Sequence, residues 1–143
     1  MFAAVEGSSQ GGMDVRGPAP SDYPASFSQQ ERQVLAAVGD PVAFAILTAL
    51  SRGEQDGHSL VVQTHLPQSS IYRKLRELEG DHLVYVSRLA ITRDGHKVEL
   101  FRSRLREMHL EFAHGQPRVR VVLREDAADR IHGMWTEVRR SVR

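Results

Sequence analysis

The feature that most constrains the fold is a pair of short helical patterns that meet at a proline. In residues 59–65, apolar side chains recur at the spacing of an α-helix. Leu66-Pro67 interrupts this pattern, because proline lacks an amide proton and disfavours helical geometry in the residue before it. A second pattern then covers residues 68–81, and the sequence predicts two short helices joined by a tight turn. The expected inward positions of the second helix are Ile71, Leu75, Leu78 and His82.

After this second helix, the apolar period falls from about 3.6 residues to about two, which indicates a change from helix to strand. Residues 83–92 are rich in Val, Tyr, Ile and Thr, and Asp94-Gly95 favours a hairpin turn before a return strand at residues 98–101. Apolar and polar residues alternate again in residues 108–112 and 119–123. The sequence therefore predicts two successive β-hairpins.

Two further helices are expected upstream. Ser28 and Glu31 are three residues apart and form a capping box, which predicts a helix start. Asp40 is a good N-cap and Pro41 suits the first helical position, so Gly39 ends one helix and another begins at once. The core-facing positions of this second upstream helix are Val42, Ala45, Ile46, Ala49 and Leu50.

The sequence divides into three segments: a tail, a central domain and a C-terminal extension. Residues 1–26 are rich in Gly, Ser, Ala and Pro, which predicts a disordered tail. Residues 27–104 hold the helices and the first hairpin, and residues 105–143 hold the second hairpin and a C-terminal helix. That helix could serve dimerisation or cover the sheet. Its apolar stripe is Ala128, Ile131, Trp135, Val138 and Val142, at alternating spacings of three and four.

Composition narrows the class of protein. The 143 residues are 41% apolar, which allows one buried core. The absence of cysteine excludes disulfides, thiolate metal sites and a cysteine nucleophile, and is compatible with a reducing cytoplasm. No apolar run approaches the ~20 residues of a membrane span. The N-terminus lacks the basic segment and apolar block of a signal peptide.

Charge is distributed unevenly. Residues 68–106 contain nine Lys or Arg and five acids, a net charge of +4, whereas the whole chain carries +1. Such a local basic zone suits a surface that contacts phosphates, although a solvated sheet face has the same composition.

Three runs of residues carry a family resemblance: residues 39–47 (GDPVAFAIL), residues 66–79 (LPQSSIYRKLRELE) and residues 82–84 (HLV). Together they resemble the winged helix-turn-helix transcription regulators, particularly the ArsR-like group of archaea and bacteria. The middle run looks like the recognition helix of that family, where Gln-Ser-Ser-x-Tyr-Arg-x-Leu is typical. The resemblance implies an α+β winged helix-turn-helix that binds double-stranded DNA, here with an added β-hairpin and a C-terminal helix.

The chain departs from the family pattern in several places. Ala43 or Phe44 stands where members often have Arg after Asp-Pro, and His82 stands where many have Gly. The related metal sensors use cysteines or a His/Asp set on the last helix, and here that helix offers only Asp129 and His132. The resemblance therefore carries over the fold and DNA binding, without metal sensing and without a cofactor.

The expected DNA contacts lie on the second short helix and at the tip of the first hairpin, the wing. Arg73 can meet O6 and N7 of guanine with both arms of its guanidinium group, worth roughly 1–3 kcal/mol of discrimination. Lys74 and Arg76 are expected on phosphates, and Tyr72 at the border between core and phosphate. The complete predicted set is Gln68, Ser69, Ser70, Tyr72, Arg73, Lys74, Arg76, Arg93, His96 and Lys97.

Other readings stay open at this point. A helix that is polar on one side is often only solvated, and a winged helix can also serve as a protein-binding module of a larger assembly. Both the near-neutral net charge and Glu77 on the exposed face favour that second reading. The sequence contains no Gly-rich phosphate loop, nucleophile elbow or HExxH motif, so an enzyme is not indicated. The expected state is a cytoplasmic homodimer on DNA.

Overall fold

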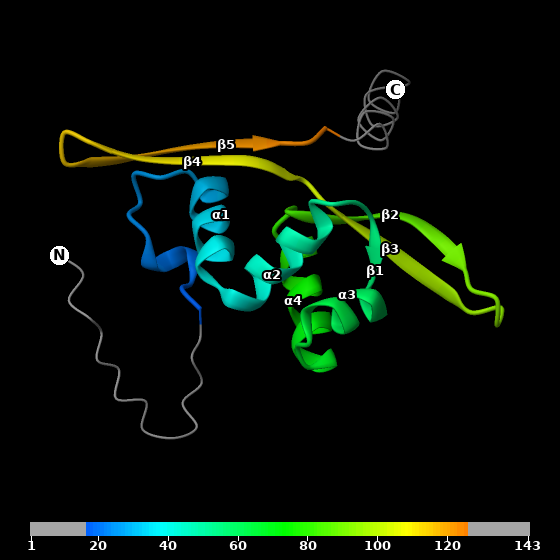
Figure 1. Cartoon of the computed structure of the whole chain (residues 1–143). Helices are drawn as coiled ribbons and strands as arrows, with labels where there is room; N and C mark the ends of the chain where they lie inside the picture. The colour runs from blue at the N-terminus through cyan, green and yellow to red at the C-terminus, as the bar shows by residue number, and fades with distance from the viewer. Residues whose placement is uncertain (1–16, 126–143) are drawn as a thin grey trace, which may run out of the picture.

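The computed structural model describes residues 17–125 and confirms the α+β class, in an arrangement compatible with a winged-helix-like fold (Figure 1). The predicted C-terminal helix and residues 1–16 of the predicted tail lie outside the described residues. The helices are α1 (Gln29–Gly39), α2 (Pro41–Leu50), α3 (Gly57–Thr64) and α4 (Gln68–Gly80), preceded by a short 3-10 turn, η1 (Pro20–Asp22). The strands are β1 (Gln55–Asp56), β2 (Val84–Ile91), β3 (Lys97–Ser103), β4 (Leu105–Ala113) and β5 (Gln116–Leu123).

Side-chain caps set the starts of the first three helices. The hydroxyl of Ser28 accepts from the amide of Glu31 at 3.1 Å, which confirms the predicted capping box. Asp40 accepts from the amides of Val42 and Ala43 at the start of α2, as expected. The expected start of α3 at Ser59 is wrong by two residues, because Asp56 caps this helix from an earlier position.

Two antiparallel sheets follow the helical part. In the first, β3 lies between β1 and β2, and β1 pairs Gln55 with Phe101. The polar residues 53–57 (GEQDG) have no apolar pattern and by themselves predict a loop. That prediction is wrong for Gln55 and Asp56, because they pair with the free edge of β3. The β2–β3 hairpin is called the wing below. Its turn includes Gly95, whose φ of 79° suits glycine.

The second predicted hairpin is also confirmed. β4 and β5 pair in register from Ala113 and Gln116 to Glu107 and Val122, and we call this hairpin the arm. Figure 1 shows the wing and the arm extending in opposite directions from the helices. Only Arg104 separates β3 from β4, and its amide donates to Leu83 at 2.8 Å. The wing and the arm are therefore parts of one nearly continuous ribbon.

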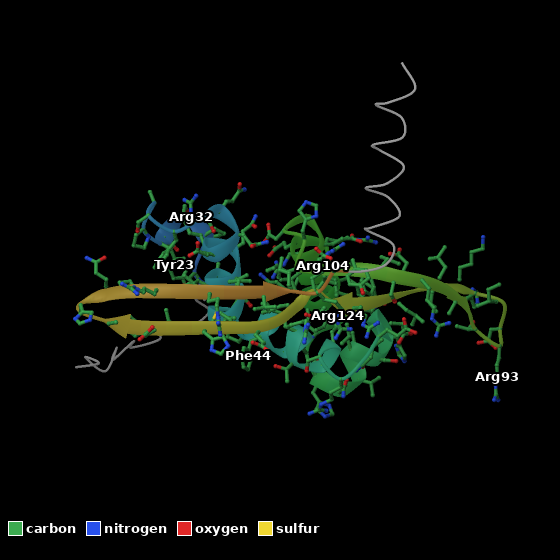
Figure 2. The ribbon with its side chains drawn as sticks, turned by 90° about the horizontal axis from the view of Figure 1, so that it is seen from above. Tyr23, Arg32, Phe44, Arg93, Arg104 and Arg124 are labelled. Carbon is green, nitrogen blue, oxygen red and sulfur yellow. The ribbon has the colours of Figure 1, made fainter. Side chains whose placement is uncertain are left out.

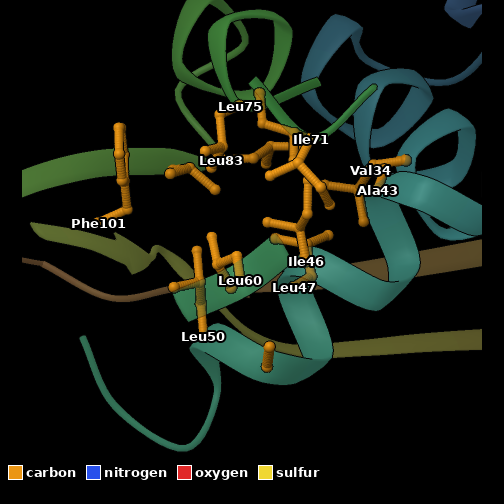
Figure 3. Packing of buried hydrophobic residues seen from close by; sticks show 14 residues of the cluster. Val34, Ala43, Ile46, Leu47, Leu50, Leu60, Ile71, Leu75, Leu83 and Phe101 are labelled. Atoms are coloured by element: carbon orange, nitrogen blue, oxygen red, sulfur yellow. The ribbon is translucent and has the colours of Figure 1, made fainter. Parts of the chain in front are cut away.

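The hydrophobic core lies between the helices and the first sheet (Figure 3). The predicted inward residues Ile71, Leu75 and Leu78 of α4 are at most 2% exposed. Burying such side chains contributes about 1.5–3 kcal/mol each, so this face fixes the rotation of α4. His82, however, was expected to face inward and is exposed. The chain turns there with a φ of 59°, and Leu83 enters the core instead.

The end of the predicted disordered tail is ordered. Residues 20–22 form η1, and the hydroxyl of Tyr23 donates to the carbonyl of Leu35 at 3.1 Å. The prediction of a tail through residue 26 is therefore wrong for residues 17–26, because this segment packs against α1.

Among residues 17–125, no single helix has the length and apolar character of a membrane span. The adjacent helices α1 and α2 reach that length and composition only when taken together, and they meet at 98°.

Candidate nucleic-acid interface

The exposed face of α4 lies opposite the apolar face that packs into the hydrophobic core. Because Ile71, Leu75 and Leu78 point into the core, the opposite face presents Ser69 and Arg73 to solvent. Pro67 occupies the N-cap position and provides no side-chain hydrogen bond. The first amides of α4 thus have no side-chain cap, and amides in that position attract anions.

Arg73 has the position that the sequence predicts. It is exposed, and within the described part of the chain its guanidinium group makes no ion pair. A guanidinium group without an internal partner can turn its five donors toward a ligand. Gln68, Ser69 and Ser70 precede it on the first turn of the same helix, with Gln68 and Ser69 exposed and Ser70 half-buried.

Lys74 differs from the prediction. Its side chain is only 17% exposed, and its ammonium group lies 2.9 Å from Asp40 and 2.7 Å from Glu77. Burial lowers the pKa of Lys74, but hydrogen bonds to Glu77 and Asp40 outweigh it, so the pKa is raised above the usual value. The sequence predicts that Lys74 lies on or beside the polar face of α4 and contacts phosphates, whereas in the structure its ammonium group is already paired with Asp40 and Glu77.

Arg76 and Tyr72 lie on the side of α4 that faces the wing. The guanidinium of Arg76 lies 3.4 Å from Glu79 and 3.8 Å from Glu99 on β3, yet most of its side chain remains exposed. The ring of Tyr72 covers Gly57 so closely that a Cβ atom there would lie 2.6 Å from it. Tyr72 therefore packs α4 against the start of α3 and keeps one edge in solvent.

The wing adds three exposed basic side chains, Arg93, His96 and Lys97. Figure 2 shows Arg93 at the far end of the hairpin. The backbone amide of Thr92 donates to the carbonyl of His96 at 2.8 Å and closes the tip. Asp94 is also exposed there and reduces the local positive charge.

A groove of about 230 Å³ lies between the wing and α4. The ion pair between Arg76 and Glu99 shows that this face of β3 points toward α4, and Lys97 lies on the same face two residues away. The groove thus brings Tyr72, Arg76 and Lys97 together, whereas Arg93 and His96 lie further out on the wing. The lining residues are Asp56, Gly57, His58, Tyr72, Arg76, Lys97, Val98, Glu99 and Phe101.

The sequence did not single out His58, which lines this groove from the exposed first turn of α3. The sequence contains one indication of this position. Asp56 is three residues before Ser59, a spacing that fits an N-cap and places His58 in the first turn of the helix. In the described residues, no group of three His, Asp or Glu side chains is arranged to hold a metal ion.

No protein-family model matches the chain, and no curated protein matches it either. The resemblance of residues 39–47, 66–79 and 82–84 to the winged-helix regulators therefore stays a prediction.

Proposed function

We propose that the chain is a sequence-specific regulator of transcription that binds double-stranded DNA. In this proposal α4 enters the major groove, and the wing lies on the backbone or in the minor groove. The observation that carries it is the combination of an unpaired, exposed Arg73 with an uncapped helix start, beside a hairpin that exposes three basic residues. Among the described residues, the Arg73 guanidinium group has no ion-pair partner and the start of α4 has no side-chain cap. Together with the basic wing, these groups suit the binding of a polyanion.

Each side chain has a specific role in the proposal. Arg73 reads guanine through O6 and N7, and Ser69 and Ser70 bind bases or a phosphate at the start of α4. Arg76, Tyr72 and Lys97 face the groove and hold a backbone phosphate there. The remaining contacts are Gln68, Arg93 and His96. Lys74 takes no direct part, because its charge is already neutralised by Asp40 and Glu77.

The proposal includes a homodimer in the cytoplasm, associated with the nucleoid. Two-fold symmetry predicts a palindromic site whose half-sites are one DNA turn, about 34 Å, apart. Selection of bound fragments from a random double-stranded DNA library tests this directly. Enrichment of one palindromic motif supports the proposal, whereas recovery of unselected sequences by the full chain contradicts sequence-specific recognition.

A protein-binding winged helix is the second candidate, and one observation favours it. Leu89 and Ile91 on β2 are 64% and 73% exposed, and they lie opposite Glu99 and Lys97, on the side of the wing that faces α4. Apolar side chains beside a basic surface suit a protein partner. Absence of DNA binding at low salt, together with co-purification of a stable partner that Ile91→Ser releases, would select this function.

A further inference from the structure

The arm has one apolar face, and only part of it is covered. In its register Met108 lies opposite Val121, Leu110 opposite Val119, and Phe112 opposite Pro117, so these six side chains share one face. The other face is mainly charged. Met108 and Val121 pack against the hydrophobic core, but Leu110 is 42% and Phe112 is 77% exposed.

The uncovered part belongs to β4. Helix α1 packs on β5, and Figure 2 shows α1 on the β5 side of the arm, with β4 on the other side. Phe44 of α2 is exposed and projects on the β4 side in the same view. An isolated two-stranded hairpin is marginal in water, so a further element is needed over the apolar face of β4.

We propose that residues 126–143 of the same chain cover this face as a helix that runs from the base of the arm toward its tip. The last described residue, Glu125, is two residues after the end of β5 at the base of the arm, so the segment starts close to the open face. As a helix, residues 128–142 measure about 21 Å. The exposed part of β4 from Met108 to Phe112 measures about 13 Å, so the segment is long enough.

Apolar pattern and charge both match this placement. The stripe of Ala128, Ile131, Trp135, Val138 and Val142 supplies one apolar side for Leu110 and Phe112. With this direction, Asp126 and Asp129 lie near Arg106 and Arg124 at the base of the arm, where opposite charges attract. Val138 then falls beside Leu110.

The absence of cysteine makes disulfide trapping a clean test in the full chain. The variant carries Leu110→Cys and Val138→Cys, and the matched control carries Glu111→Cys and Val138→Cys, because Glu111 lies on the opposite face of β4. We expect an intrachain disulfide to form about tenfold faster in the first protein, since only that pair can reach disulfide geometry. Equal rates, or disulfides only between two chains, would overturn the proposal, and the second result would assign this face to a second copy.

Fluorescence provides an independent readout, because Trp135 is the one tryptophan of the sequence. Leu110→Ser should shift its emission to longer wavelength and increase quenching by acrylamide, whereas Glu111→Ser should change neither. An emission maximum typical of water in the unmodified protein, unchanged by Leu110→Ser, would also overturn the proposal. Both readouts are independent of DNA binding.

Discussion

The carboxylate of Asp40 lies 2.9 Å from the ammonium group of Lys74, and this ion pair joins the start of α2 to the middle of α4. The same carboxylate accepts hydrogen bonds from the amides of Val42 and Ala43 at 2.9 and 3.1 Å. Burial raises the pKa of Asp40, but the hydrogen bonds from Lys74 and the two amides outweigh it, so the pKa is lowered from its usual 3.8. One side chain therefore both caps α2 and positions the helix that we propose reads DNA.

Replacing Asp40 tests this double role. Asp40→Ala removes the cap and leaves Lys74 with only Glu77, so the free energy of unfolding should fall by about 1–3 kcal/mol. Asp94→Ala at the exposed wing tip is the control, and it should change stability by less than about 0.5 kcal/mol. Urea denaturation measures both, and equal stability of the two variants would contradict the role of Asp40.

The contribution of Asp40 also depends on pH in a defined direction. Because its pKa is lower in the folded protein than in the unfolded chain, the stabilisation is present above the unfolded pKa and is lost as pH falls through the folded pKa. The difference in unfolding free energy between the unmodified protein and Asp40→Ala should therefore shrink as pH falls from neutrality to below 3.8. A constant difference would show that the charge of Asp40 is unimportant.

Asp81, which follows α4, should behave in the opposite way. Burial and the charge of Glu77 raise its pKa, although His82 and Lys74 partly offset this. Asp81→Asn removes the charge at a helix C-terminus and keeps an acceptor for Gln33, so it should stabilise the protein by about 0.3–1 kcal/mol at neutral pH. The gain should disappear at low pH, where Asp81 is protonated. Thermal unfolding at both pH values checks this, and a destabilised variant at neutral pH would refute it.

Gly57 and Tyr72 should show coupled effects. A Cβ atom at residue 57 would lie 2.6 Å from the Tyr72 ring, so Gly57→Ala must displace the ring and should cost about 1–3 kcal/mol of stability. In a Tyr72→Ala background, the same substitution should be nearly neutral. A double-mutant cycle in denaturant measures the coupling. Additive effects would mean that the ring moves away freely.

Substitutions of two lysines, Lys97 and Lys74, should distinguish a residue that contacts DNA directly from one that positions α4. Lys97→Ala removes an exposed charge at the groove, so it should weaken binding to all DNA sequences and reduce the salt slope by about 1. Lys74→Met should leave the salt slope unchanged, because Lys74 is already paired. Fluorescence anisotropy at several salt concentrations gives both slopes. A smaller slope for Lys74→Met alone would mean that the ion pair with Asp40 opens on DNA.

Local patterns predicted most of the fold. The caps at Ser28 and Asp40, the turn at Leu66-Pro67 and the hairpin at Asp94-Gly95 depend on neighbouring residues, and the structure has all four. The strand β1 was missed because Gln55 and Asp56 have no strand pattern of their own. They pair only because β3, more than forty residues away, has a free edge there.

The candidate site was predicted less completely, for the same reason. The exposure of Arg73 follows from the helical spacing of Ile71 and Leu75. The ion pair of Lys74 depends on Asp40, which is distant in sequence, and periodicity along one helix cannot indicate such a pair. The prediction that His82 faces inward assumes that the helical spacing of α4 continues to residue 82. It is wrong because α4 ends at Gly80 and the chain turns at His82 with a positive φ.

The most direct test of the proposed function compares DNA affinity of the unmodified protein with two arginine variants at low and moderate salt. Arg73→Ala removes the proposed base contact, whereas Arg118→Ala removes an exposed arginine of β5 in the arm, on a different element from α4 and the wing. On the selected DNA site, Arg73→Ala should lose about 1–3 kcal/mol of specific binding, and Arg118→Ala should bind like the unmodified protein. Equal affinity of all three proteins for selected and random DNA would contradict the claim that α4 reads DNA.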